Sequence, residues 1–175
     1  MAEGTKVIGG GISAPSNRLT RGRCPRVPND GTTTDFQDSP YSSVEVSLTA
    51  AQIKALRATP ITMVPAPGAG KVIDFIGAHL QLIAGGTGFT ESGANLGFKY
   101  TDGSGVQVNE TVEATGFIDQ TVNTNTSARK KLDPIVAASA ATNQALVLHN
   151  IGGSEIATGD GTMKVKVLFA VHAAG

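Results

Sequence analysis

One short segment of the chain has the residue types of a phosphate-binding loop. Gly68–Lys71 is a glycine-rich turn that ends in lysine, and such turns hold phosphates through their backbone amides. The loop also needs a glycine five residues before Gly70 and a magnesium-binding hydroxyl after the lysine, but Pro65 and Val72 occupy these positions. Apolar residues then recur at every second position, so a strand follows and no helix N-terminus is available for a phosphate. We expect no nucleotide site here.

Histidine and cysteine residues do not form a metal-binding or catalytic set in the sequence. His79, His149 and His172 are far apart, and none has a second histidine or a carboxylate at zinc-ligand spacing. Each is therefore expected to be a packed or interface histidine. Cys24 is the one cysteine, so the chain has no internal disulfide and no thiolate ligand set. We predict no metal and no cofactor.

Serine and acidic residues also lack a catalytic arrangement. Asp102 stands where a nucleophile elbow around Ser104 would need its leading glycine. Asp102 and Asp160 each precede a glycine, which is typical of turns, and neither loop has the carboxylates of a calcium site. Two carboxylates brought together by the fold could act on a glycoside, but such sites usually have aromatic platforms and this chain has no Trp and two Tyr. We predict that the protein is not an enzyme.

The charges of the chain balance. Lysine plus arginine number 14, as do aspartate plus glutamate, so no general attraction to nucleic acid or to an anionic membrane is expected. The basic triplet Arg129–Lys131 has no aromatic residue interleaved with it and is expected to be a solvated loop. No run of 18 apolar residues and no signal-peptide core is present, so we expect synthesis in the cytoplasm.

The first 43 residues differ in composition from the rest. Residues 1–43 are rich in Gly, Pro, Ser, Thr and Asn without sustained periodicity, which is typical of an extended arm, and residues 44–175 are expected to form one domain. Four arginines precede three aspartates in this arm. The arginines are Arg18, Arg21, Arg23 and Arg26. They could bind an acidic groove on a partner or a neighbouring subunit, or the arm could be a solvated tail.

The longest apolar run predicts the central strand of the fold. Two strands are expected between Pro60 and Ala84, joined by a turn of Pro and Gly residues. Alternation in the second strand assigns one face to the core, namely Val72, Ile76, Ala78, Leu80 and Leu82. Phe75 and His79 then lie on the opposite, mixed face. There they are candidates for contacts between subunits, or they pack under a loop of the same chain.

Further alternating segments predict the rest of the sheet structure. Val44–Leu48 reads as a strand, and a capping-box pattern from Thr49 to Gln52 predicts a short helix after it. Strands are also expected at Leu96–Tyr100, Val106–Val108, Ala145–Asn150 and Thr162–His172, whereas Thr121–Ser127 reads as a polar loop. Met163, Val165, Val167, Phe169 and Val171 form the expected apolar face of the last strand. The fold class predicted is all-β: a jelly-roll-like antiparallel β-sandwich with an extended N-terminal arm and one short helix.

Three features together resemble small virion structural proteins of tailed bacteriophages. They are a Gly/Pro-rich N-terminal arm, the segment SVEVSLTAAQIKALRATPITMVPAPGAGKVIDFIGAHLQLIAGGTGFT, and a Gly/Thr/Asn-rich series of strands ending in TMKVKVLFAVH. The similarity runs from about Val44 to His172. Its most specific parts are LTAAQIKAL and VPAPGAGKVI. Among these proteins, the chain most resembles capsid decoration, or cement, proteins.

The resemblance implies a structural role. It implies a jelly-roll-like protomer, often a homotrimer, that sits on the outer surface of the capsid in the virion and ties neighbouring major capsid proteins together. It brings no catalytic residues with it. It also does not separate a cement protein from a head-fibre base or another minor virion component.

Two other classes of function stay open at this point. The first is a head-fibre or tail-associated binding module, in which the loops at Thr87–Asn95 and Thr121–Lys131 recognise a receptor or a glycan. The second is a small hydrolase or lyase, which would require carboxylates or histidines that converge in a pocket. The low aromatic content and the lack of a catalytic constellation favour the structural role.

Overall fold

A computed structural model of the chain describes residues 41–132 and 136–174. The expected arm, with Arg18, Arg21, Arg23 and Arg26, lies outside the described residues except for its last three positions. The first strand begins at Ser42, two residues before the predicted start of the folded domain.

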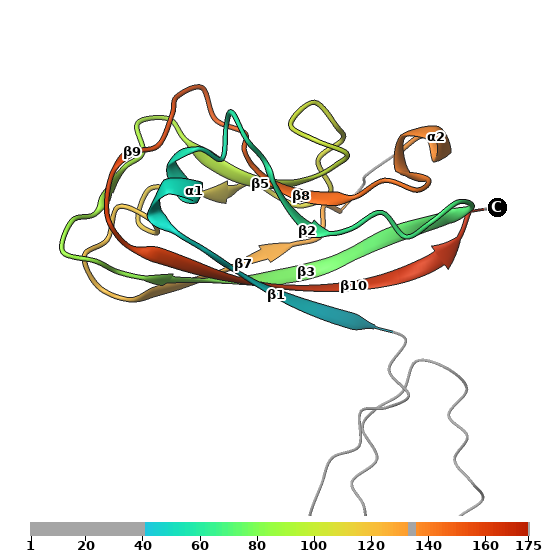
Figure 1. The fold of residues 1–175 in the computed structure, drawn as a ribbon, viewed down its shortest axis with the longest axis horizontal. Coiled ribbons are helices and arrows are strands. Elements are labelled where there is room, and N and C mark those ends of the chain that lie inside the picture. Colours follow the sequence, from blue (N-terminus) through green and yellow to red (C-terminus); the bar gives the residue numbers. More distant parts are fainter. Residues whose placement is uncertain (1–40, 133–135, 175) are drawn as a thin grey trace, which may run out of the picture. The chain divides into compact units, whose positions relative to one another are not determined.

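Two antiparallel sheets of four strands face each other in the described residues (Figure 1). The first sheet contains, in spatial order, β1 (Ser42–Leu48), β10 (Thr162–Ala173), β3 (Lys71–Ile83) and β7 (Thr124–Arg129). The second contains β2 (Ile61–Val64), β8 (Leu146–Asn150), β5 (Asn95–Tyr100) and β6 (Val112–Glu113). A separate ribbon pairs β4 (Phe89–Thr90) with β9 (Ala157–Thr158). The predicted all-β sandwich is confirmed.

The core of the sandwich joins the two sheets through aromatic residues. The rings of Phe75 on β3 and Phe98 on β5 stack with their centroids 5.0 Å apart, and both side chains are buried. The hydroxyl of Tyr100 donates a hydrogen bond of 2.5 Å to the backbone carbonyl of Ile73 across the same space. These contacts hold the middle of one sheet against the middle of the other.

The helix predicted after the first strand is present. In α1 (Ala50–Lys54), the Thr49 hydroxyl accepts a hydrogen bond from the Gln52 amide, and the Gln52 side chain accepts one from the Thr49 amide. This reciprocal pair confirms the capping box. A second helix, α2 (Ala138–Ala141), was not predicted, because four small residues without a capping side chain carry no helical periodicity.

The turn of Pro and Gly residues connects the two sheets. β2 pairs with β8, whereas β3 pairs with β10 and β7, so the two strands that the turn joins lie in different sheets. Gly68 and Gly70 have φ angles of 100° and 67°, in the region that favours glycine. The side-chain oxygen of Asn143 accepts a hydrogen bond from the Gly68 amide. Gly68–Lys71 is thus a crossover turn of the sandwich.

A β-bulge in β3 overturns part of the predicted core face. Leu168 on β10 pairs with Gly77 and Phe169 pairs with Phe75, so Ile76 is an extra residue in the ladder. The bulge reverses which side chains point inward, because the side-chain period of a strand is two. Phe75 is 1% exposed in the core, and the prediction of Phe75 as an intersubunit contact is therefore wrong. His79, beyond the bulge, is exposed, and its role between subunits stays a prediction.

The burial of β10 confirms its predicted apolar face in part. Met163, Val165 and Val167 are buried, as expected. After the bulge, Ala170 is 2% exposed and Val171 is 44% exposed, although Val171 was assigned to the apolar face. The predicted core face of β3 is thus confirmed on one side of the bulge and wrong on the other, whereas that of β10 continues to Phe169, which packs against the core, and is wrong at Val171.

The polar loop predicted at Thr121–Ser127 is in large part the strand β7. Residues Thr124–Arg129 pair with Gly77–Leu82 of β3. Ala128 is buried, whereas Asn125, Ser127 and Arg129 are exposed. The alternation was missed because an edge strand above a small part of the core needs few large apolar residues. Among the described residues, no helix has the length and apolar character needed to cross a membrane.

Replacement of Phe75 tests the corrected core face. Phe75→Ala should lower the free energy of unfolding by about 3–5 kcal/mol, because it removes a fully buried ring and leaves a cavity. His79→Ala, four residues along the same strand, should change it by less than about 0.5 kcal/mol. Urea unfolding of the two variants measures both values, and equal losses would contradict the face assignment.

Candidate functional site

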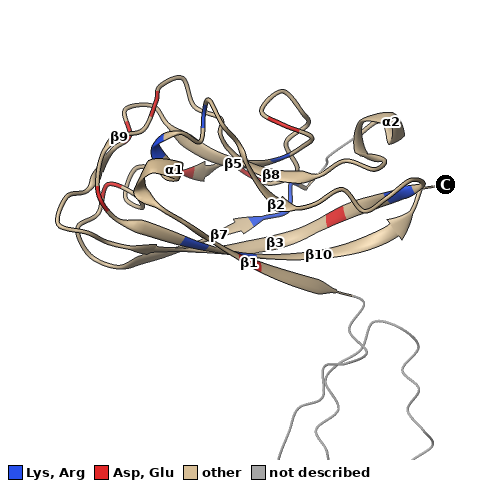
Figure 2. Cartoon of the chain, in the orientation of Figure 1, with Lys and Arg blue, Asp and Glu red and all other residues tan. Residues whose placement is uncertain are grey.

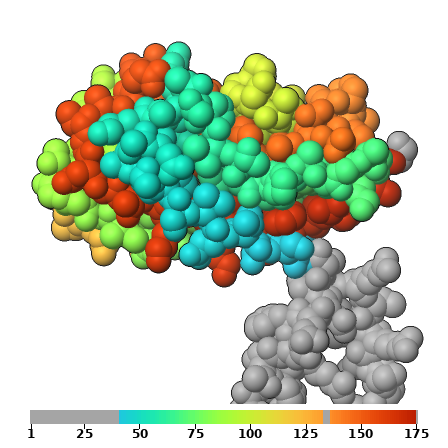
Figure 3. All heavy atoms as spheres, viewed as in Figure 1, coloured from blue at the N-terminus to red at the C-terminus, as the bar shows by residue number. Residues whose placement is uncertain are grey.

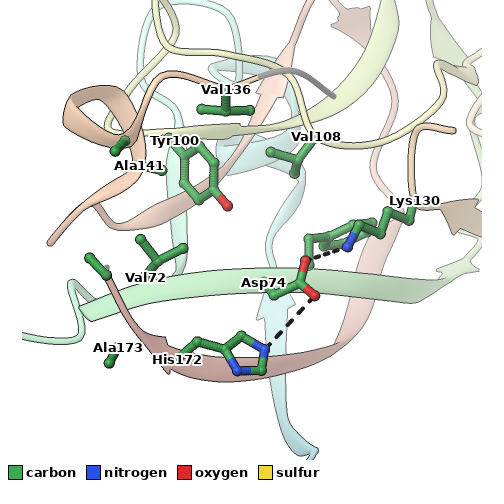
Figure 4. A pocket seen from close by; sticks show the side chains of 12 residues that line it. Val72, Asp74, Tyr100, Val108, Lys130, Val136, Ala141, His172 and Ala173 are labelled. Atoms are coloured by element: carbon green, nitrogen blue, oxygen red, sulfur yellow. Dashed lines mark hydrogen bonds and ion pairs between the residues drawn. The ribbon is translucent and has the colours of Figure 1, made fainter. Parts of the chain in front are cut away.

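A groove of about 350 Å³ lies beside β3, where β7 ends (Figure 4). The pairing of β7 with β3 stops at Arg129 and Gly77, and the next bridge on β3 joins Val72 to Thr142. The groove opens between these two points. Apolar side chains make up most of its wall: Val72, Phe75, Tyr100, Val108, Val136, Ala138, Ala141 and Ala173.

Three ionisable side chains meet at the rim of the groove. The Lys130 ammonium lies 2.5 Å from one carboxylate oxygen of Asp74, and the His172 Nε2 lies 4.0 Å from the other. Lys130 and Asp74 are both partly exposed, so this pair stabilises the fold by no more than about 1 kcal/mol. Lys130, predicted to be solvated, therefore has an acidic partner.

Tyr100 forms the floor of the groove and is held in its neutral form. Burial, together with the nearby Asp74 carboxylate, raises the pKa of Tyr100 to about 12. Its hydroxyl donates a hydrogen bond to the Ile73 carbonyl. The Tyr100 hydroxyl therefore already donates its proton to a hydrogen bond within the fold.

The chemistry of the groove suits contact rather than bond breaking. Its polar groups are a carboxylate paired with lysine, a histidine at the rim and a phenol that already donates. No nucleophile lies beside a base among these side chains. Within residues 41–132 and 136–174, no group of three His, Cys, Asp or Glu side chains could hold a metal ion.

The three histidines lie in different surroundings. His79 is on the outer face of β3, opposite Lys166, and His172 is near the end of β10. His149 lies on β8 in the other sheet, with its Nε2 3.2 Å from the Arg57 carbonyl. The structure therefore does not bring the histidines together, as expected from their separation in the sequence.

His149 is the most perturbed of these side chains. Burial lowers the pKa of His149, and the cations Lys99 and Arg57 lower it further, while the Arg57 carbonyl and Asp102 act in the opposite direction. Its Nδ1 is buried and has no hydrogen-bond partner among the described residues. His149 is consequently favoured as a neutral, packed side chain.

Asp102 and Asp160 organise turns, as predicted. One oxygen of Asp102 accepts hydrogen bonds from the Ser104 amide and hydroxyl, at 2.7 and 2.6 Å, and these bonds lower the pKa of Asp102. The Asp160 carboxylate accepts from the Gly86 and Thr87 amides, at 3.2 and 2.8 Å. Asp102 therefore holds its own turn, whereas Asp160 holds the turn at Gly86 and Thr87, which is distant in the sequence.

The outer face of the β1-β10-β3-β7 sheet is the broadest polar surface built on strands. Cross-strand pairing places Lys166 between Glu45 and His79, and Lys164 between Ser47 and Gln81. These lysines, His79 and Glu45 are exposed. In Figure 2, cations and anions are dispersed over the strands and loops, and no large block of one sign is seen. The described surface therefore has no concentrated block of positive charge.

Sequence reasoning did not predict the groove, although one signal for it was present. Asp74 is the one charged residue inside the apolar run of β3, and it is the residue on which Lys130 and His172 converge. The sequence of the chain matches no protein-family model and no curated protein.

Tyr100 should make stability fall at alkaline pH. The unfolded chain loses its tyrosine proton near the ordinary pKa of 10.0, but folded Tyr100 keeps it to about 12, so the folded state loses stability as pH rises between these values. Tyr100→Phe should remove this contribution. Urea unfolding of both proteins over this pH range measures it, and an equal alkaline loss in the variant would contradict the assignment.

His149 should have the reverse effect at mildly acidic pH. Its pKa is lowered from 6.5 in the folded state, so below pH 6.5 the unfolded chain binds a proton that folded His149 resists, and stability falls with falling pH. His149→Gln keeps a polar side chain but cannot titrate, and should reduce the slope of stability against pH. Thermal unfolding across this range gives the slope, and an unchanged slope would refute the role of His149.

Proposed function

We propose that this chain is a non-enzymatic structural protein of a phage virion. It binds the outer surface of the capsid and stabilises it by bridging neighbouring major capsid proteins. Two supports carry the proposal: the resemblance of Val44 to His172 to capsid decoration proteins, and the strand order of the sandwich.

The strand order is the observation that carries the most weight. In chain order, β1, β2, β3, β5, β6, β7, β8 and β10 alternate between the two large sheets except at β5 and β6. The first strand lies beside the last, and β3 lies beside both β10 and β7. We interpret this order as a jelly roll, an architecture common among viral capsid domains. Because one fold serves many functions, the sequence resemblance is needed to choose among them.

The surface chemistry agrees with a role that needs contact area alone. The ionisable groups of the groove are already paired or hydrogen-bonded within the chain, and Asp102 and Asp160 hold turns. A cement protein performs no bond chemistry and acts by adding buried surface across the boundaries of its partners. The rigid sandwich supplies such a surface.

Two sets of residues have proposed roles in this function. Arg18, Arg21, Arg23 and Arg26 of the arm bind an acidic groove on the major capsid protein or on a neighbouring subunit. His79 lies at a contact between subunits of the homotrimer that the resemblance implies. An arm that becomes ordered on docking reaches contacts that a globular domain does not reach.

Co-sedimentation with capsids tests the function and the arm together. Full-length protein should pellet with heads assembled from the major capsid protein of the same phage. Replacing Arg18, Arg21, Arg23 and Arg26 with glutamine should weaken this binding at least tenfold, because four charge-assisted contacts are lost. The protein bound per head, measured against concentration, gives the affinity.

A matched control separates the arm from general electrostatics. Replacing Lys54, Arg57, Lys71 and Lys131, four cations of the sandwich that do not lie beside His79, with glutamine removes the same charge. This control should pellet almost as well as the unmodified protein. Equal loss in both variants would contradict the role of the arm, and unmodified protein that stays in the supernatant would sink the capsid proposal itself.

A further inference from the structure

The four edges of the two sheets differ in how well they are protected against pairing with another strand. An exposed edge offers unpaired backbone groups to other chains, and proteins protect it with short strands, prolines, lysines, bulges or covering segments. The edge strands here are β1 and β7 in one sheet and β2 and β6 in the other.

Two of these edges carry such protection along their length, and a third, β7, carries it at its end. β6 has two residues. β2 has four, with a register shift between Thr62 and Val64 and a proline on either side, Pro60 and Pro65. The end of β7 is covered by the segment Val108–Glu110, because the Glu110 amide donates to the Arg129 carbonyl and the Lys131 amide donates to the Val108 carbonyl.

Among the described residues, no segment covers the edge of β1, and its one charged residue is Glu45. Its seven residues pair with β10 in an unbroken register from Ser42 to Leu48 and include no proline, glycine, lysine or arginine. No described residue forms a strand ladder with the side of β1 that faces away from β10. Figure 3 shows this segment, in light blue, at the surface of the sandwich. Val44 and Val46 face inward, yet they stay partly exposed, and no strand of the described residues lies beyond them.

We propose that β1 pairs antiparallel with β1 of a second copy of this chain, which joins the two first sheets into one of eight strands. The second copy is the occupant that the strand itself favours, because it brings an equally long and regular edge and the same row of inward apolar residues. A two-fold axis perpendicular to the sheet keeps both inner faces on the same side.

The charge and the apolar row of β1 select the register. Residues that lie opposite each other in an antiparallel ladder point to the same face of the sheet. The two-fold axis must therefore pass through one residue position, which lies opposite the same position of the partner strand. An axis through Glu45 sets two carboxylates against each other. An axis through Val44 places Val46 opposite Ser42 of the partner subunit. An axis through Val46 pairs Glu45 with Ser47 of the partner subunit and Val44 with Leu48 of the partner subunit, which covers the apolar row.

This contact deepens the proposed function without depending on the capsid. On its own the two-fold contact gives a dimer, and combined with a three-fold contact it gives a hexamer. The mass of the purified protein therefore reports on the β1 contact, whereas co-sedimentation reports on the capsid, and either can fail separately.

Light scattering of the purified full chain, together with one pair of variants, tests the contact. The unmodified protein should have the mass of two or six chains. Val46→Lys places an inward charge on the β1 edge and should halve the mass, or reduce six chains to three. Thr126→Lys is the matched control, because Thr126 is a partly buried residue of the other edge strand and lies opposite buried Leu80. It should leave the mass unchanged.

A cysteine pair tests the register even if Val46→Lys fails to fold. In a Cys24→Ser background, Val46→Cys should cross-link two copies on oxidation, because the axis brings the two positions 46 together, and Val44→Cys should cross-link several-fold less. A mass of one or three chains for the unmodified protein would overturn the proposal. So would a mass that Val46→Lys leaves unchanged in folded protein, or cross-linking at position 44 in preference to 46.

Discussion

The pairing of β3 with β10 is the interaction on which the rest of the structure depends. These are the two longest strands, and they pair along nearly their whole length in the middle of one sheet. β1 pairs with the outer side of β10, and β7 pairs with the outer side of β3. Neither edge strand would therefore form without the central pair of β3 and β10. The bulge at Ile76 then reverses which side chains of β3 point inward, so that Phe75 lies in the core and His79 lies outside.

The sequence predicted the regular elements of this fold well. Alternation from Val44 to Leu48 and the capping box at Thr49 are local patterns, and the structure has both. The bulge could not be read in the same way, because alternation predicts a strand but does not show where one residue is inserted against its partner. β7 was missed for a related reason: Thr and Asn residues form a strand there only because β3 lies beside them.

The candidate site, like the fold, could be predicted from the sequence only where the contacts are local. That Asp102 holds its turn was predictable, since it acts on an amide two residues away, whereas the contact of Asp160 with the Thr87 amide, 73 residues away, was not. The groove at Asp74 was not, because Lys130 and His172 come from strands that meet β3 only in the folded chain. The ionisable groups of the groove interact with one another. The sandwich therefore offers a partner its polar outer face and the edge of β1 rather than reactive groups. That balance supports the structural role that we propose.

Electron cryomicroscopy of capsids incubated with the full chain tests the central claim most directly. The account predicts additional density of the size of this sandwich on the outer surface of the head, at the boundaries between neighbouring major capsid proteins. Bare heads at saturating protein concentration, or density confined to the tail or to fibres, would contradict it.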